Sequence, residues 1–299
     1  MENAGDGPRD GQSSQGSAGP GLREAYVVWA LLGVAALLDV LTYSRIAPHD
    51  LYHVSHSGLA GGLGRAFVFL NFPTALAAIA IVLLVSDRTG WRWPSVVSIV
   101  LCAVIVVPGV VDQANLDAKW INVVPAVGVA IALVLTLRAG RDGWGDPRGD
   151  PIRIAVAIVL AILALPWMFA LAGFYFPGSR VIYHGEARVH LGEHHGLEGY
   201  LLVLTALLLS RQLPTMRRST ALAAYLSLMI PYGIGNMLND AWNEQIVKRG
   251  WTSWKIPGVL QPSLTWMWAL IVVAAAAIFF TAFQQRRDHA ATHRPGPET

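Results

Sequence analysis

Residues 154–176 read IAVAIVLAILALPWMFALAGFYF, a run of 23 residues that contains no charged side chain. At a rise of 1.5 Å per residue, about 20 residues cross the ~30 Å hydrocarbon core of a bilayer. Seven more apolar blocks of similar length occur, so the sequence predicts an all-α, polytopic membrane helix bundle with about eight transmembrane helices. The predicted spans are residues 25–44, 66–86, 95–112, 120–137, 154–176, 194–210, 220–239 and 259–284.

The composition excludes an ordinary soluble domain. Only 14% of the 299 residues are charged, whereas soluble proteins carry roughly 25%, and the mean hydropathy is +0.46. The net charge of +3 comes from Arg residues clustered in short loops, so it indicates membrane lipids as partners and no nucleic acid. The single cysteine, Cys102, excludes an internal disulfide and a Cys-based zinc site. The oligomeric state is left open.

Composition divides the chain into three segments. Residues 1–22 are rich in Gly, Ser, Asp and Pro and predict a disordered cytoplasmic tail, and residues 287–299 predict a second one. The transmembrane helical domain is expected over residues 23–286. A cleaved signal peptide is not expected, because the first span is full length and lacks a convincing cleavage site.

A four-plus-four internal repeat is one interpretation of the polar positions. An offset of 124 residues lays the second predicted span on the sixth and the third on the seventh, and it pairs Asp112 with Asn236. The parallel halves would be residues 23–138 and 152–286, related by an axis along the membrane normal. Apolar helices also resemble one another by composition alone, so chance similarity is the alternative.

The basic residues predict that both termini are cytoplasmic. Fourteen of the 22 Lys and Arg residues fall in the two tails and in the three loops on the same side of the membrane as the tails. Cytoplasmic segments carry such an excess under the positive-inside rule. Only three of the 22 are Lys, which is typical of GC-rich coding sequence and favours a bacterial plasma membrane as the location.

Polar side chains gather at the predicted outer ends of the spans. Seven of the nine histidines lie there, whereas the cytoplasmic loops carry mainly Arg, Asp, Gly and Pro. The run His194-His195-Gly196-Leu197-Glu198 falls at the outer rim of the sixth span. A carboxylate at that depth is costly unless it is neutral, paired or in a wet cavity. Glu198 therefore marks a candidate functional site, with helix packing as the alternative.

Two other spans end in polar stripes at the same depth. Asp112 and Asn115 share one face of the third span, and Asn236, Asn239 and Asp240 share one face of the seventh. These stripes predict one polar cavity that opens outward, with interhelical hydrogen bonding as the alternative. The side chains expected to line the cavity are Asp39, Asp112, Asn115, His194, His195, Glu198, Asn236, Asn239 and Asp240.

Asp39 lies about five residues inside the outer end of the first span. Two interpretations stay open for it at this point. Its carboxylate either lines the same cavity or forms an ion pair with a cation such as Arg45.

A divalent metal site is an alternative use of the histidines. His190, His194 and Glu198 stand at i, i+4 and i+8 and would share one helical face as ligands. The spacing His190-x3-His194-His195 also resembles one histidine box of membrane di-iron desaturases and hydroxylases. Such boxes would face away from cytoplasmic electron donors here, and the membrane domain has no third box.

One seven-residue fragment is similar to a different family. His194-x3-Glu198-Gly199-Tyr200 resembles the His-x3-Glu-Gly-aromatic stretch of emopamil-binding-type sterol isomerases, which protonate and deprotonate a lipid double bond. The resemblance implies proton transfer at Glu198. Fewer than 40 residues separate Glu198 from Asn236, too few for the additional span of that family, so the analogy is one of chemistry.

Tryptophans concentrate near the outer end of the second half. They fit an aromatic belt at the membrane interface, and the alternative is that they shield a carbocation by cation–π contact. The residues concerned are Trp242, Trp251, Trp254, Trp266 and Trp268.

These patterns favour a membrane-embedded enzyme that uses acid–base chemistry on a lipid or isoprenoid, as a cyclase, isomerase or hydrolase. A carboxyl group at low dielectric tends to stay protonated and can act as a general acid. Glu198 and His194 are the expected proton-handling pair, with Asp240 or Asp112 accepting a proton.

Proline-broken spans and repeated halves also suit a transporter or a solute- or metal-binding protein. A non-catalytic accessory subunit is the third interpretation.

Overall fold

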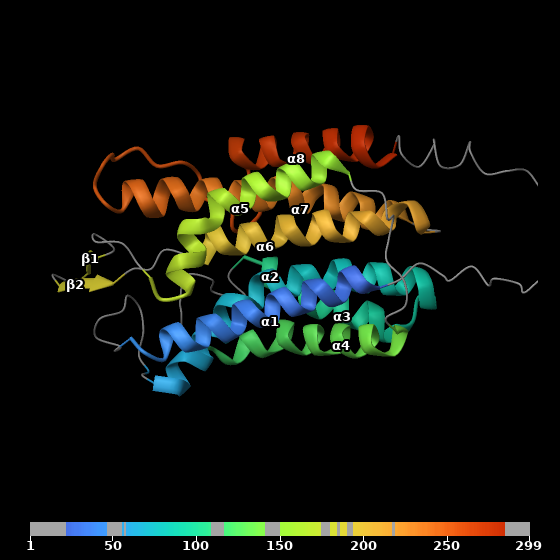
Figure 1. Ribbon diagram of the computed structural model, residues 1–299, viewed down its shortest axis with the longest axis horizontal. Coiled ribbons are helices and arrows are strands. Elements are labelled where there is room, and N and C mark those ends of the chain that lie inside the picture. The colour runs from blue at the N-terminus through green and yellow to red at the C-terminus, as the bar shows by residue number, and fades with distance from the viewer. Residues whose placement is uncertain are drawn as a thin grey trace, which may run out of the picture.

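The computed structural model describes residues 22–46, 56, 58–108, 117–140, 150–174, 180–183, 186–189, 194–216 and 219–284. Its main elements are α-helices that run along the long axis of the molecule (Figure 1). The helices are α1 (Arg23–Tyr43), α2 (Gly58–Thr89), α3 (Trp93–Ala103), α4 (Val123–Ala139), α5 (Pro151–Leu171), α6 (His194–Leu209), α7 (Ser219–Asn239) and α8 (Trp266–Ile278).

Short elements extend or connect these helices. Two strands, β1 (Arg180–Tyr183) and β2 (Glu186–Val189), form an antiparallel hairpin between α5 and α6. Other helix types continue the α-helices: 3-10 turns at Val104–Val106, Trp120–Asn122 and Ser210–Thr215, and π-helices at Asp240–Val247 and Phe279–Gln284.

Each predicted span corresponds to one helix, and the prediction of a helical membrane bundle is confirmed. Six helices are long and apolar enough to cross a membrane. The α-helical part of α3 has 11 residues and that of α6 has 16, and 3-10 turns lengthen both. Both predicted tails lie outside the described residues, apart from Leu22, which is buried at the start of α1. The four-plus-four repeat stays a prediction.

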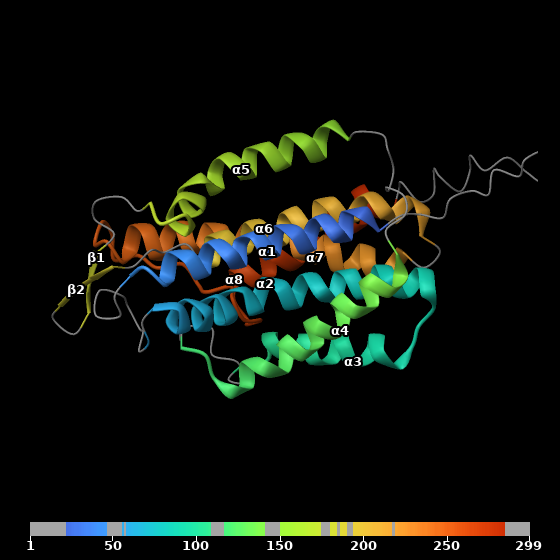
Figure 2. The same ribbon diagram turned by 60° about the horizontal axis from the view of Figure 1, so that its bottom comes forward.

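The chain runs back and forth, so α1 begins and α8 ends at the same end of the bundle (Figures 1 and 2). We call this the termini end, and we call the opposite end, where β1 and β2 lie, the hairpin end. The hairpin end is the one that the basic residues predict to be outside. Helix α6 lies centrally and packs against α1, α2, α5 and α7.

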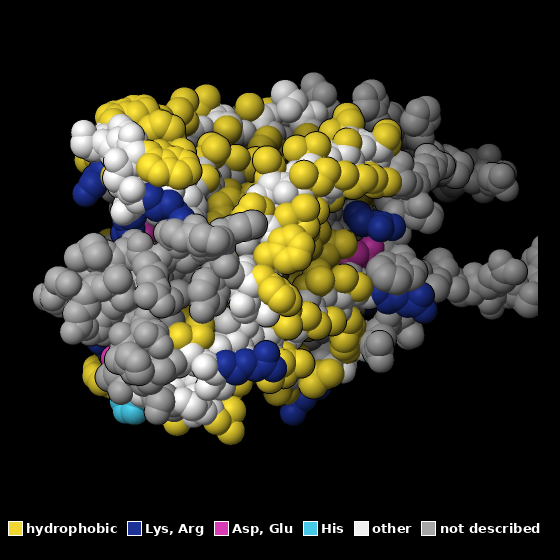
Figure 3. All heavy atoms as spheres, turned by 60° about the vertical axis from the view of Figure 1, so that its left-hand side comes forward, with side chains coloured by type: hydrophobic (Ala, Val, Ile, Leu, Met, Phe, Trp, Pro, Cys, Tyr) yellow, Lys and Arg dark blue, Asp and Glu magenta, His cyan; other side chains and the backbone are white. Residues whose placement is uncertain are grey.

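The flanks of the bundle suit a hydrocarbon environment. Hydrophobic side chains cover much of the helical flank (Figure 3). On α5 and α8 large apolar side chains point outward, including Ile162 and Val273, which is 67% exposed. A lipid bilayer would cover this surface, since soluble monomers rarely expose such large apolar patches.

Two glycines set the distance between α6 and α7. A Cβ atom added to Gly199 would lie 2.3 Å from the carbonyl oxygen of Gly233, and one added to Gly233 would lie 2.5 Å from that of Gly199. Both neighbours are backbone atoms, which cannot rotate away. Small residues allow membrane helices to approach this closely, and tight packing is a main source of their association.

We expect Gly199→Ala to destabilise the protein by about 1–3 kcal/mol, because the new methyl group forces α6 and α7 apart. Thermal unfolding in detergent measures the effect. Gly33→Ala is the matched control, since a Cβ at Gly33 meets no atom within 4 Å and alanine favours the helix. Equal melting temperatures for the two variants would contradict the proposed close contact.

Candidate functional site

The first turn of α6 holds a histidine–carboxyl pair. His195 Nδ1 lies 3.1 Å from Glu198 Oε2, with the two residues three apart along the helix. The Glu198 side chain is 3% exposed and that of His195 is 25% exposed. The pair therefore lies where Glu198 is enclosed by protein while the imidazole retains access to the surface. The sequence predicted His194 as the partner of Glu198. The described contact is that of His195, while the side chain of His194 lies outside the described residues, so its role stays a prediction.

A second buried carboxyl group reaches the pair from the neighbouring helix. Asp240 begins the π-helix that continues α7, and it is 1% exposed. The Trp167 indole Nε1 donates a hydrogen bond of 2.6 Å to Asp240 Oδ2, and Gln245 Nε2 lies 3.5 Å from the same oxygen. Asp240 and Glu244 also act electrostatically on His195. π-helical turns occur frequently at functional sites.

These contacts place three titratable groups together at the hairpin end: His195, Glu198 and Asp240. The sequence analysis predicted that Glu198 and Asp240 would lie near each other across α6 and α7, and both interact with His195. It also predicted an open cavity, but both carboxyl groups are nearly inaccessible in this conformation. His195 and Glu198 lie at hydrogen-bond distance and can exchange a proton directly, and His195 is the more exposed of the two.

Trp167 was not anticipated as a site residue. It lies on α5 directly after Pro166, and its ring packs on the backbone of Gly196, where an added Cβ would lie 2.1 Å from the indole Cε2. Gly196 thus makes room for the indole between α5 and α6. The sequence gives no signal for this contact, because Trp167 stands in an apolar run where an aromatic side chain ordinarily faces lipid.

We expect Trp167→Phe to lower stability by about 1–3 kcal/mol, because it leaves an oxygen of buried Asp240 without its closest donor. Thermal unfolding of the purified protein measures this loss. Trp93→Phe serves as the control, since Trp93 is 76% exposed on α3. If both variants melt at the wild-type temperature, the Trp167–Asp240 hydrogen bond is not a stabilising contact.

The asparagines of α7 bond to backbone groups. The Asn236 side chain donates to the Tyr232 carbonyl at 3.0 Å, and Asn239 donates to the Pro257 carbonyl at 2.8 Å. Asn243 in the π-helix holds Ile256 through both its donor and its acceptor. The bonds of Asn239 and Asn243 fasten the segment before α8 to the end of α7 and its π-helical continuation, whereas that of Asn236 stays within α7. Their assignment to a cavity wall stays a prediction, while the observed contacts fit the hydrogen-bonding alternative.

Asp39 is fully buried on α1, and the structure reveals a second buried charge near it. Arg65 on α2 is 2% exposed, and its guanidinium carbon lies 5.0 Å from the ring centre of Tyr43, one turn after Asp39. A cation over an aromatic face at this distance is a favourable contact. Arg65 directly precedes the second predicted span, which was expected to start at residue 66.

Several predicted site residues lie outside the described residues: His190, Asp112, Asn115 and the side chain of His194. Within the residues that are described, no group of three or more His, Cys, Asp or Glu could hold a metal ion. Two of the predicted metal ligands, His190 and the side chain of His194, lie outside the residues to which this finding applies. The metal site stays a prediction.

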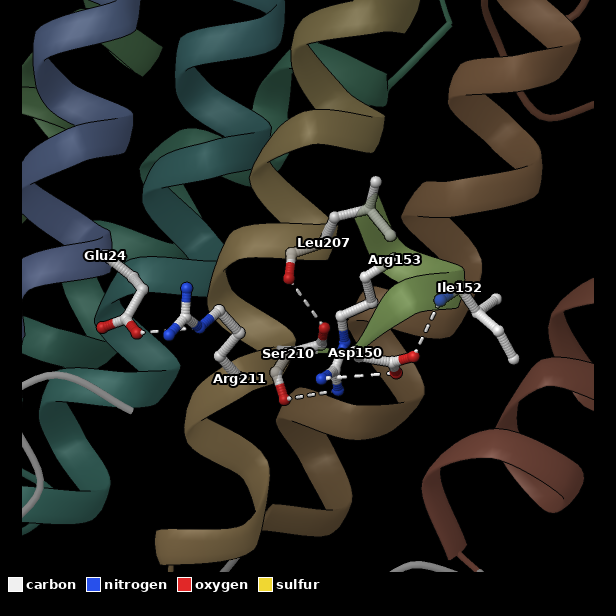
Figure 4. A network of polar contacts seen from close by, with 7 residues as sticks. All are labelled: Glu24, Asp150, Ile152, Arg153, Leu207, Ser210 and Arg211. Atoms are coloured by element: carbon white, nitrogen blue, oxygen red, sulfur yellow. Dashed lines mark hydrogen bonds and ion pairs between the residues drawn. The ribbon is translucent and has the colours of Figure 1, made fainter. Parts of the chain in front are cut away.

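The termini end holds a separate polar network that the sequence analysis missed (Figure 4). Glu24 on α1 is fully buried, its Oε1 lies 3.5 Å from Arg211 Nε, and its other oxygen accepts a hydrogen bond from Gln212. Arg153 on α5 reaches the carbonyl of Ser210 in the same 3-10 turn. Contacts from α1 and α5 thus converge on the 3-10 turn that follows α6 at the termini end.

A seven-residue spacing along α6 was the available signal for this network. Glu198, Thr205 and Gln212 recur at that interval, and all three are buried. A repeat of seven keeps residues on nearly the same face of a helix. These three residues, two on α6 and Gln212 in the 3-10 turn that follows it, therefore form one buried polar stripe from the hairpin end to the termini end.

Comparison of the chain with models of known protein families, with curated proteins and with solved structures finds no match. Its helices make it an integral membrane protein.

Proposed function

We propose that this membrane protein is an enzyme that uses acid–base chemistry on a lipid or isoprenoid substrate at the hairpin end. The observation that carries the proposal is the buried Glu198 side chain, which contacts His195 at 3.1 Å. Asp240, in the π-helix that continues α7, is held by Trp167, whose ring packs on the backbone of Gly196 next to His195. An intramembrane carboxyl group is a functional-site hypothesis by default.

The environments of the two carboxyl groups support different roles. Glu198 is enclosed by α6 and α7 and would give a proton to a double bond or leaving group of the substrate. Asp240 is held by Trp167 and Gln245 and would accept the proton released later in the reaction. His195, the more exposed group, would carry protons between the cluster and the solvent. General acid–base catalysis of this kind contributes roughly 10²–10⁴-fold to a rate.

A proton-coupled transporter is the second candidate, and the network at the termini end favours it. A buried carboxyl group lies at each end of the polar stripe: Glu198 at the hairpin end, and Glu24 of α1, which contacts Gln212, at the termini end. The stripe has wide gaps, however: seven residues correspond to about 10 Å along a helix, several times the length of a hydrogen bond. Transport would therefore need a conformational change that brings water or solute between these levels.

Lipid analysis of cells with and without the protein tests the proposal. We expect expression to convert one lipid into a species of equal mass, for an isomerase or cyclase, or into two products whose masses add up to that of the lipid plus one water, for a hydrolase. Mass spectrometry of lipid extracts detects either change. Unchanged lipids together with solute uptake by proteoliposomes would contradict the enzyme and support the transporter.

The orientation belongs to the same proposal, with both termini in the cytoplasm of a bacterial cell. We expect a cysteine at Ser253, exposed at the hairpin end, to react with an impermeant maleimide in whole cells. A cysteine at Thr89, exposed at the termini end, should react only after the cells are opened. The native Cys102 is fully buried and should add little background. The reverse pattern would move the candidate site to the cytoplasmic side.

A further inference from the structure

An apolar groove of about 520 Å³ runs between α7 and α8. This volume lies within the ~300–1,000 Å³ range of small-molecule sites. Ile230 and Ile278 line its inner part, and three tryptophans line the part toward the hairpin end: Trp242, Trp254 and Trp266. The groove faces away from α6, because Gly233 and Met237 on the other side of α7 pack against Gly199.

The length of the groove matches one leaflet of a bilayer. Trp242, in the π-helix that continues α7, lies twelve positions after Ile230, and Ile278 lies twelve positions after Trp266 on α8. At 1.5 Å per residue this corresponds to about 18 Å, against about 15 Å for half of a ~30 Å hydrocarbon core. The tryptophans then lie at the interfacial level, where the indole is favoured.

Hydrogen bonds preform the wall at the hairpin end. The Trp242 Nε1 donates to the Trp254 carbonyl at 2.8 Å, and the two rings meet edge to face with centres 5.2 Å apart. Asn243 holds the backbone of Ile256, another lining residue, through two hydrogen bonds. A wall fixed in advance reduces the entropy lost when a flexible chain binds.

A lysine, Lys255, belongs to the segment that forms this wall. Lys255 lies between Trp254 and Ile256, which both line the groove, and its side chain is exposed. Among the described residues, no ion pair of Lys255 is found, whereas nearby Lys248 pairs with Glu244. An exposed ammonium group that forms no ion pair among the described residues, and that neighbours two lining residues of an apolar, leaflet-long groove, is complementary to a lipid with a hydrocarbon chain and an anionic head.

We propose that the groove between α7 and α8 binds one acyl chain of an anionic phospholipid, whose phosphate lies at Lys255. The chain fills the space between Ile230 and the tryptophans, and the head group projects at the membrane interface. The site is independent of the proposed enzyme activity, because its lining lies on the face of α7 opposite Glu198. Either proposal can fail without the other.

Native mass spectrometry of the full-length protein tests the site, with phosphatidylglycerol and phosphatidylcholine of identical acyl chains as probes. We expect one phosphatidylglycerol to bind about fivefold more tightly than phosphatidylcholine, the scale for one basic residue beside an anionic lipid. Lys255→Gln should abolish this preference. Lys119→Gln, which removes an exposed lysine from a segment that does not line the groove, should keep it. Equal binding of both lipids by the wild type would overturn the anionic head group.

Filling the groove tests the position of the chain. Ala274 lines the groove, whereas Ala276 on the same helix is exposed and lies outside it. We expect Ala274→Trp to reduce binding of both lipids at least tenfold and Ala276→Trp to leave it unchanged. Ala274→Leu, which adds less volume, should give an intermediate loss and covers the case in which the Trp variant does not fold. Wild-type binding by a folded Ala274 variant would overturn the proposal.

Discussion

Replacing Glu198 by Gln is expected to reduce turnover of the proposed reaction by about 10²-fold or more while the protein remains folded. Glutamine keeps the size of the side chain and can still hydrogen-bond to His195, which lies 3.1 Å from the carboxyl oxygen. It cannot release or take up the proton. The loss should therefore appear in the rate of conversion at saturating substrate, measured with purified protein and the lipid identified from cell extracts.

A second substitution at the same position separates proton transfer from packing. Glu198→Asp retains an acid but shortens the side chain, so we expect it to recover part of the turnover that Gln loses. Both variants should melt near the wild-type temperature, because both keep a polar group toward His195. Full activity of a folded Glu198→Gln protein would remove Glu198 from the mechanism, and a variant that fails to accumulate in the membrane would favour a packing role.

Hydropathy was sufficient for the fold, because the requirement to satisfy backbone groups within lipid leaves few alternatives to helices. It was least accurate at the starts of the second and eighth spans. α2 begins at Gly58, eight residues before the predicted start at 66, and α8 begins at Trp266, seven residues after the predicted start at 259. The residues before α8 are held against α7 by Asn239 and Asn243, a contact that a local average cannot detect.

Only part of the candidate site could be predicted from hydropathy and helical spacing. Depth in the membrane identified Glu198 and Asp240, because a buried carboxyl group is conspicuous in an apolar segment. The side chains that hydrogen-bond to these carboxyl groups could not be predicted in the same way. Trp167, for example, lies on α5 and contacts Asp240, which is 73 positions away in the sequence. Helical spacing relates residues on one helix, and it carries no information about which face of another helix meets them.

Glu24 gives the clearest case of such a long-range contact, and we expect Glu24→Leu to cost about 1–3 kcal/mol of stability. The substitution leaves the fully buried amide of Gln212 without its carboxylate acceptor. Arg211 should add little to this loss, because its side chain is 33% exposed and can be hydrated. Denaturant unfolding in detergent micelles measures the change.

The double variant Glu24→Leu with Gln212→Leu distinguishes a structural network from a functional one. Replacing both partners by apolar groups can be nearly neutral, since no buried polar group is then left unsatisfied. We therefore expect the double variant to regain most of the stability that Glu24→Leu loses. If it is stable and retains lipid conversion, the network holds α1 against α6 and does no chemistry. If it is stable but has lost lipid conversion, the Glu24–Gln212 pair contributes to the reaction as well as to the fold, which the proposed mechanism at the hairpin end does not require.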